Sequence, residues 1–414
     1  MEDALAARDA AEGVARRSYG KLIAFLSART RDVAAAEDAL AEAFAAALAD
    51  WPKNGVPQSP EAWLLAVARR KSVDAARRRR TGEQAAEHLK MMQDELDAAA
   101  THATDIPDQR LALMFACAHP AIDPAIRAPL ILQTILGFDA ATIASAFLIA
   151  PAAMGQRLAR AKQKIARAGV PFRVPARAET AERLDAVLVA IYAAFAEGWS
   201  DPAGTETRRR NLSEEGIWLG RLVVSLLPDA PEALGLLALM LHAEARRGAR
   251  RNAQGDYVPL AEQDPRLWDS ELIDEAEALL RRASTFGTIG RYQLEAAVQS
   301  AHAVRRIAGA VDWEAIVKLY DGLLALTGSP VVAINRAVAI AETQGAPAGL
   351  AALDAIADDG RLAEYQPHWA ARAVLLGRIG ETAQAIEAYE RAIGLERDPA
   401  VRRFLQQRSA ALRN

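Results

Sequence analysis

The stretch from Ile126 to Ile165 constrains the fold more than any other part of the chain, because its apolar residues recur with the period of an α-helix. Asp139 is a candidate N-cap of a short helix, and Pro151 lies in the first turn of a second one. The apolar stripe of this second helix consists of Met154, Leu158, Ala161 and Ile165. Helical spacing places a polar and cationic set on the opposite face, namely Gln156, Arg157, Arg160 and Lys164. The pattern predicts a helix-turn-helix whose last helix presents hydrogen-bond donors to the major groove of DNA.

A second basic helix is expected between Ser59 and Arg80, with Ser59 at the N-cap and Pro60 in the first turn. Its expected buried face consists of Trp63, Leu64 and Val67. Its second half carries seven Lys or Arg against one acid, Asp74. Each basic helix alone also fits a solvated surface. Two of them about 80 residues apart, each preceded by apolar helices, favour two separate contacts with nucleic acid.

Length and composition predict an all-α protein of two or three domains. A chain of 414 residues is long for a single hydrophobic core. Ala and Leu dominate, and no run alternates apolar with polar residues over the length of a strand. Residues 1–178 carry 24 Lys or Arg against 20 Asp or Glu, whereas the remainder carries 26 against 33. Phosphate would repel this acidic second part, so we expect it to bind something other than DNA.

Several classes of protein are not expected. Cys117 is the single cysteine, which excludes an internal disulfide and a cysteine metal cluster, and we interpret it and His119 as core and helix end. The six histidines lack metal-ligand spacing, and there is no phosphate-binding glycine loop, so we expect no enzyme, no cofactor and no metal. The first residues are acidic, and the longest apolar runs are about half of a membrane span. We therefore expect a soluble, cytoplasmic protein that binds no membrane.

Two motifs in the first 80 residues carry a resemblance to a known family. EDALAEAF runs from Glu37 to Phe44, and EAWLLAVARRKSVDAARRRR runs from Glu61 to Arg80. Together with the helix-turn-helix, they resemble the bacterial extracytoplasmic-function sigma factors, which direct RNA polymerase to promoters. In that family the first motif is the region 2 helix on the polymerase clamp, the second recognises the minus-10 element, and region 4 reads the minus-35 element. The resemblance implies that the partners are core RNA polymerase, through its clamp and flap, and promoter DNA.

The resemblance also implies roles for particular residues. Polymerase contacts are expected from the acidic helix, at Glu37, Asp38, Glu42 and Phe44. The minus-35 element would be read by Gln156, Arg157, Arg160 and Lys164. Minus-10 contacts would come from the basic helix and from the preceding loop, where the family captures an unstacked base, at Lys53, Asn54, Trp63, Arg69, Arg70, Lys71, Arg77 and Arg78.

On this basis the chain divides into four parts. Residues 1–80 correspond to region 2, and residues 109–176 correspond to region 4. Residues 81–108 carry seven acids and one Lys; they are either a solvated linker or, as the resemblance implies, a segment that occupies the basic channel of the polymerase. Such a linker lets the two regions separate, which two promoter elements about 25 base pairs apart require. Residues 177–414 resemble the helical-repeat extension of one subgroup of these sigma factors.

The clearest unit of this extension runs from Trp369 to Pro399, where small and aromatic residues are spaced much as in a tetratricopeptide repeat. Looser versions upstream predict tetratricopeptide-like repeats over about residues 312–399. Stacked hairpins leave a concave surface suited to a peptide or protein partner, although the same array can be purely structural. We expect the acidic extension to regulate the basic front part of its own chain.

Two other classes fit part of the pattern. One is a stand-alone helix-turn-helix transcription regulator whose tail is a sensor or dimerisation unit. The other is a tetratricopeptide scaffold protein whose basic front part binds RNA or an acidic partner. The acidic motif followed by the Trp63 helix favours the sigma factor over both.

Overall fold

The structure, a computed structural model, describes residues 2–79, 109–147, 149–175, 177–199 and 207–413. These residues form α-helices and short 3-10 helices, with one isolated bridge between Arg251 and Tyr257 and no strand among them. The predicted all-α class is confirmed. The linker expected over residues 81–108 lies outside the described residues. No helix in the described ranges combines the length and the apolar character that crossing a bilayer requires.

The chain forms two compact units. Unit 1 contains Met1–Gly198 and Asn211–Gly216, and unit 2 contains Trp199–Arg210 and Ile217–Asn414. Helix α10 (Thr207–Leu226) contributes to both. Unit 1 thus extends beyond residue 176, where the sequence places the end of region 4, and the four-part division stays a prediction.

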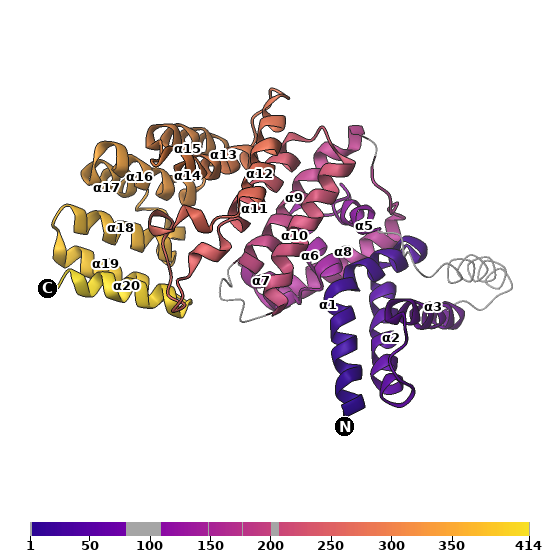
Figure 1. The fold of residues 1–414 in the computed structure, drawn as a ribbon. Coiled ribbons are helices and arrows are strands. Elements are labelled where there is room, and N and C mark those ends of the chain that lie inside the picture. The colour runs from indigo at the N-terminus through magenta and orange to yellow at the C-terminus, as the bar shows by residue number, and fades with distance from the viewer. Residues whose placement is uncertain (1, 80–108, 148, 176, 200–206, 414) are drawn as a thin grey trace. The chain divides into compact units, whose positions relative to one another are not determined.

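Unit 1 begins with a bundle of three helices, α1 (Glu2–Thr30), α2 (Val33–Asn54) and α3 (Pro60–Arg79), which pack against one another (Figure 1). Asp32 caps α2, because its side chain accepts a hydrogen bond of 3.0 Å from the Ala35 amide. The core of the bundle includes fully buried side chains from all three helices, namely Leu22, Ile23, Leu40, Trp51 and Leu64.

Five further helices complete most of unit 1. In chain order these are α5 (Arg110–Cys117), α6 (Pro124–Leu136), α7 (Ala140–Ala146), α8 (Pro151–Ala168) and α9 (Arg177–Trp199). Helices α5 and α6 pack against α1, and α8 packs against both α2 and α6. The bundle and the α5–α8 segment therefore pack together within unit 1.

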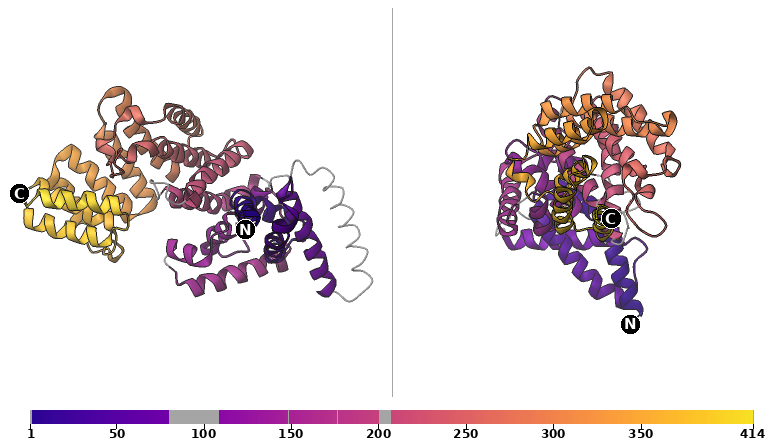
Figure 2. Two further views of the ribbon diagram at one scale, coloured as in Figure 1. Left: turned by 60° about the horizontal axis from the view of Figure 1, so that its bottom comes forward. Right: turned by 90° about the vertical axis from the view of Figure 1, so that its left-hand side faces the viewer.

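Unit 2 contains the second half of α10 and a series of shorter helices. In chain order these are α11 (Pro231–Glu244), η1 (Arg247–Arg250), η2 (Leu260–Glu262), η3 (Pro265–Leu267), α12 (Ser270–Ser284), α13 (Arg291–Ala303), α14 (Arg305–Ala308), α15 (Trp313–Thr327), α16 (Pro330–Gln344), α17 (Ala346–Asp354), η4 (Gly360–Leu362), α18 (Gln366–Arg378), α19 (Thr382–Leu395) and α20 (Pro399–Ala411). From α15 to α20 each helix packs against the next, and Figure 2 shows α18, α19 and α20 side by side in yellow.

The hairpin expected near the end of the chain is present as α18 and α19. The two helices and α20 share a cluster of buried side chains, formed by Ala373, Leu376, Ala385, Ala388, Tyr389, Ala392 and Leu405. Small residues in this cluster allow the paired helices to approach closely, as expected for a repeat hairpin. That this hairpin is a tetratricopeptide-like repeat stays a prediction.

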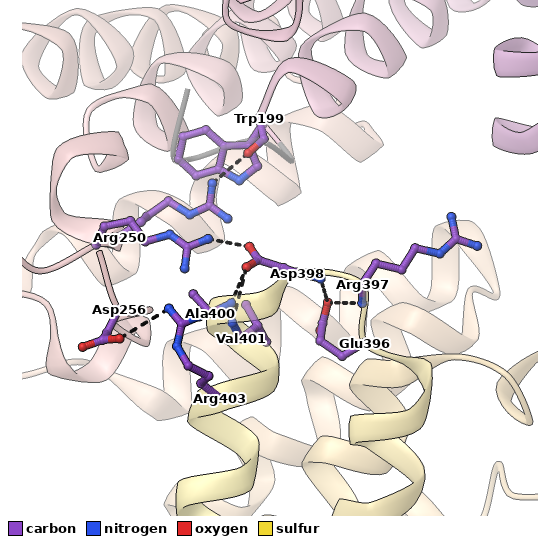
Figure 3. A network of polar contacts seen from close by, with 10 residues as sticks. Trp199, Arg250, Asp256, Glu396, Arg397, Asp398, Ala400, Val401 and Arg403 are labelled. Atoms are coloured by element: carbon purple, nitrogen blue, oxygen red, sulfur yellow. Dashed lines mark hydrogen bonds and ion pairs between the residues drawn. The ribbon is translucent and has the colours of Figure 1, made fainter. Parts of the chain in front are cut away.

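The last helix of unit 2 returns to the loop that follows α11 (Figure 3). Asp398 caps α20 by accepting a 2.8 Å hydrogen bond from the Ala400 amide, and it also pairs with Arg251. Arg403 of α20 lies 3.5 Å from Asp256 of the same loop. These contacts join residues as far as 147 positions apart, so the last helix of unit 2 packs against the loop near the start of the same unit.

Candidate nucleic-acid and polymerase interface

Helix α8 has one buried face and one exposed polar face. Pro151 occupies its first turn, and Gly169 ends it in the left-handed conformation, with φ 60°. Its four buried residues are Met154, Leu158, Ala161 and Ile165, which confirms the predicted apolar stripe. The four candidate minus-35 residues are all exposed, namely Gln156, Arg157, Arg160 and Lys164. A helix with this division can pack on its own domain while it offers guanidinium, amide and ammonium groups to DNA.

Helix α7 begins as the sequence predicts. The Asp139 side chain accepts a 2.7 Å hydrogen bond from the Thr142 amide, and Ile143 is buried. Helix α7 packs against α8, and both pack against α6. The two consecutive helices are thus confirmed, whereas their use as a DNA-reading helix-turn-helix stays a prediction.

The face that α3 buries differs in part from the predicted one. Leu64 is buried as expected, but Leu65 and Ala68 complete the face, while Trp63 and Val67 remain partly exposed. The reason is that α3 packs against both α1 and α2, so its contact face is wider than a single stripe. The Trp63 ring meets the edge of the buried Trp51 ring, with 5.6 Å between centroids.

The candidate minus-10 residues fall into three groups. Lys53, Asn54, Arg70 and Lys71 are exposed. The guanidinium of Arg69 is half-buried and lies 5.2 Å from the centre of the Phe25 ring, so it contributes to the packing of α3 on α1. The side chains of Arg77 and Arg78 lie outside the described residues.

The acidic residues of α2 do not share one environment. Asp38 and Glu42 are exposed, and Glu42 lies 3.2 Å from the ammonium of Lys71 on α3. Phe44 is half-buried. Glu37 instead points toward α8, where one of its carboxylate oxygens lies 2.5 Å from the Lys162 ammonium.

The Glu37–Lys162 pair is largely removed from water. Only 18% of the Glu37 side chain and 12% of the Lys162 side chain are exposed. Burial raises the pKa of the Glu37 carboxyl above its usual range, although the attraction of Lys162 opposes this shift. Sequence reasoning missed the pair, because the two residues are 125 positions apart and no local pattern links them.

Cys117 and His119 lie in the core and at a helix end, as interpreted from the sequence. Cys117 is fully buried at the end of α5, 3.5 Å from the hydroxyl of Thr134. Burial raises the pKa of its thiol to about 12, so the thiol stays protonated near neutral pH. The His119 ring accepts a 3.1 Å hydrogen bond from the Ala121 amide and thereby stabilises the turn after α5.

Ion pairs also join the α5–α8 segment to the residues that follow it in unit 1. Arg110 at the start of α5 is buried and pairs with Glu215. Arg127 on α6 is buried as well and lies 3.5 Å from Glu182 on α9. The start of the expected extension is therefore part of the same packed body as α8.

The three-helix bundle places the acidic motif of α2 beside the basic motif of α3. Residues 14–81 match the family Sigma-70 region 2, a range that includes α2, α3 and the larger part of α1. Residues 183–284 match a family of unknown function, DUF6596. An uncharacterized protein of Rhizobium meliloti is 39% identical over 369 residues, which cover 88% of this chain and 87% of that protein. No solved structure matches the chain.

The chain belongs to the same family as the Rhizobium protein. Its match to Sigma-70 region 2 supports the identification of the chain as a factor of the sigma-70 family. This region implies a role in RNA polymerase-directed transcription, with core RNA polymerase and promoter DNA as partners.

Proposed function

We propose that the chain is an extracytoplasmic-function sigma factor that reads a minus-10 and a minus-35 element and is regulated by its own helical extension. The observation that carries the proposal is the Sigma-70 region 2 match over the bundle that also holds the acidic and basic motifs. Region 4 would be the segment from α5 to α8, where the exposed face of α8 supplies the DNA contacts.

The minus-35 contacts are assigned to two kinds of side chain. Arg157 and Arg160 are exposed on α8, and a guanidinium can donate two hydrogen bonds to a guanine edge. Lys164 lies at the same face and is better suited to a phosphate, because an ammonium is a point charge without a planar fork. Gln156 is the amide candidate for an adenine edge.

The minus-10 contacts are assigned to the end of α2 and the exposed side of α3. Lys53 and Asn54 close α2 and are exposed, so they can reach a base that leaves the stack. The Asn54 amide nitrogen donates a 2.7 Å hydrogen bond to the Asp50 carboxylate, one turn earlier on α2. Arg70 and Lys71 would contact the DNA backbone nearby.

Polymerase binding is assigned to the acidic residues Glu37, Asp38 and Glu42 of α2 and to Phe44 on the same helix. The regulatory role is assigned to the extension, residues 177–414, since it is acidic and its helices over about residues 312–399 are spaced as in repeat hairpins. A protein or peptide partner of these hairpins would carry the signal.

Binding of the free chain and of its complex with core polymerase to one promoter fragment tests this function. The region up to residue 178 has an excess of only four cations, which is too few to hold duplex DNA tightly without polymerase. We expect weak binding by the free chain and specific binding once core is added. Arg160→Ala should lower the specificity of the complex, whereas Arg167→Ala, at an exposed cation of the same helix outside the assigned set, should not. Tight, sequence-specific binding by the chain alone would instead identify a stand-alone regulator.

A further inference from the structure

A cluster of arginines lies in and around η1, the short helix that follows α11 in unit 2. The arginine cluster consists of Arg246, Arg247, Arg250 and Arg251, together with Arg305 of α14, and all five are half-buried. Residues 179–414 carry more acids than cations, so this concentration of positive charge does not follow from the composition of the extension. Half-buried cations are costly unless a partner compensates their charge.

Carboxylates compensate two of the five arginines. Arg247 lies 2.7 Å from Glu244, and Arg251 pairs with Asp398 at the start of α20. Only 13% of the Arg251 side chain is exposed, and its Nε and Nη1 atoms are buried without a hydrogen-bond partner among the described atoms. The arginine cluster thus has more donors than the surrounding residues accept.

Two further guanidiniums donate hydrogen bonds to neutral oxygen atoms. Arg246 donates to the main-chain carbonyl of His242 and to the side-chain carbonyl of Gln299. Arg250 donates to the Trp199 carbonyl over 2.8 Å, as Figure 3 shows, and its guanidinium lies 4.2 Å from the centre of the Trp199 ring. Neutral acceptors satisfy the N–H groups but leave the positive charge uncompensated.

Arg305 reaches the arginine cluster from α14. It donates to two main-chain carbonyls over 2.9 and 2.8 Å, and its guanidinium lies 5.2 Å from the centre of the Trp268 ring. Burial, together with the charges of Arg250 and Arg305, lowers the pKa of Arg246 to about 10. Arg246 therefore lies between two like charges, and their repulsion lowers the stability of the folded chain until an anion offsets it.

We infer that the arginine cluster is a binding site for a small anion that carries a phosphate or diphosphate group, with Arg246, Arg250 and Arg305 as its ligand-binding side chains. Each guanidinium offers a planar fork of donors that matches the oxygen atoms of a phosphate. Three cations without carboxylate partners favour a ligand with more than one negative charge. The inference goes beyond the proposed function and does not depend on it, because every residue involved belongs to unit 2.

The test uses the full chain and pyrophosphate as the probe, with calorimetric titration as the measurement. Arg250→Gln and Arg305→Gln each remove one uncompensated cation from the arginine cluster. Arg397→Gln is the matched control, because Arg397 is an exposed cation of the same unit whose side chain points away from Asp398 in Figure 3. Urea unfolding of each protein without the probe shows whether the variant is folded.

We expect pyrophosphate to bind the wild-type chain at one site and to raise its unfolding midpoint, whereas sodium chloride at equal ionic strength should not. Each cluster variant should bind pyrophosphate about tenfold or more weakly, because it lacks charge-assisted hydrogen bonds to the anion. The Arg397→Gln protein should bind it as wild type does.

A second measurement uses the wild-type chain alone, so it does not depend on whether a variant folds. Burial and the charges of Arg246 and Arg305 lower the pKa of His302 to about 4. An anion bound to these arginines offsets their charges and should raise the pKa of His302. The ring-proton resonance of His302, assigned with a His302→Phe variant, reports this pKa with and without saturating pyrophosphate.

Three results would overturn the inference. One is that the wild-type chain does not bind pyrophosphate, and another is that folded cluster variants bind it as tightly as the control does. The third is an unchanged pKa of His302 at saturation. Succinate at equal ionic strength tests the class of ligand, and tighter binding of succinate than of pyrophosphate would contradict a phosphate site in favour of a dicarboxylate site.

Discussion

Arg157 and Leu158 are neighbours on α8, and substitutions at these two positions test DNA reading and packing separately. Leu158 is 1% exposed, whereas Arg157 beside it is exposed. Leu158→Ala removes three buried carbon atoms and leaves a cavity, so it should lower the free energy of unfolding by about 2 to 5 kcal/mol. Arg157→Ala removes no buried contact and should change that free energy by about 0.5 kcal/mol or less.

For DNA reading the order of the two substitutions should be the opposite, with Arg157→Ala causing the specific loss. If Arg157 donates to a guanine edge, its loss costs about 1 to 3 kcal/mol at the base pair that it reads, which is roughly 5- to 150-fold in affinity. Lys164→Ala, at a phosphate contact, should weaken all sequences alike. The assay is binding of the polymerase complex to promoters that differ at single minus-35 positions, together with urea unfolding of each variant. Uniform losses from Arg157→Ala across all sequences would refute base reading, and a large loss of stability would refute its exposed placement.

Three further predictions follow from other contacts. A fragment that ends at residue 226 should stay folded and unfold at a higher urea concentration than one that ends at residue 177. The reason is that only the longer fragment keeps the ion pair between Arg110 and Glu215. Equal unfolding midpoints would contradict this expectation. Ala substitution of Lys53 and Asn54 should relax preference at the minus-10 element without changing the minus-35 preference, as read by transcription from promoter variants. Burial, together with nearby Arg246 and Arg305, lowers the pKa of His302 to about 4. The unfolded chain therefore takes up a proton at His302 at a higher pH than the folded chain does. The free energy of unfolding should fall as the pH drops from about 6.5 to 4. The loss is of order 3 kcal/mol, and His302→Phe should flatten it in urea titrations at pH 7 and pH 4.5.

The local features of α7 and α8 could be predicted from the sequence because they depend on neighbours along the chain. Asp139 caps α7 through an amide three residues away, and Pro151 and Gly169 bound α8. The stripe of α8 follows from its helical period alone. For the same reason the hairpin of α18 and α19 could be expected from the spacing of its small residues.

Features that depend on distant segments could not be predicted in this way. Leu65 and Ala68 of α3 are buried because two helices flank them, which the sequence of α3 does not reveal. Glu37 looks like its acidic neighbours in the sequence, yet its carboxylate pairs with Lys162 of α8. The ion pair between Arg127 and Glu182 likewise joins residues whose separation along the chain carries no periodic signal.

Run-off transcription measures whether the chain directs core polymerase to promoters. Core polymerase from the source bacterium is incubated with the full chain and with a genomic promoter library, and transcripts are mapped by their 5′ ends. We expect transcripts to appear only when the chain is present and to share minus-10 and minus-35 elements. Arg160→Ala should change the minus-35 element alone. Transcription that does not depend on the chain, or that shares no promoter elements, would contradict the proposed function.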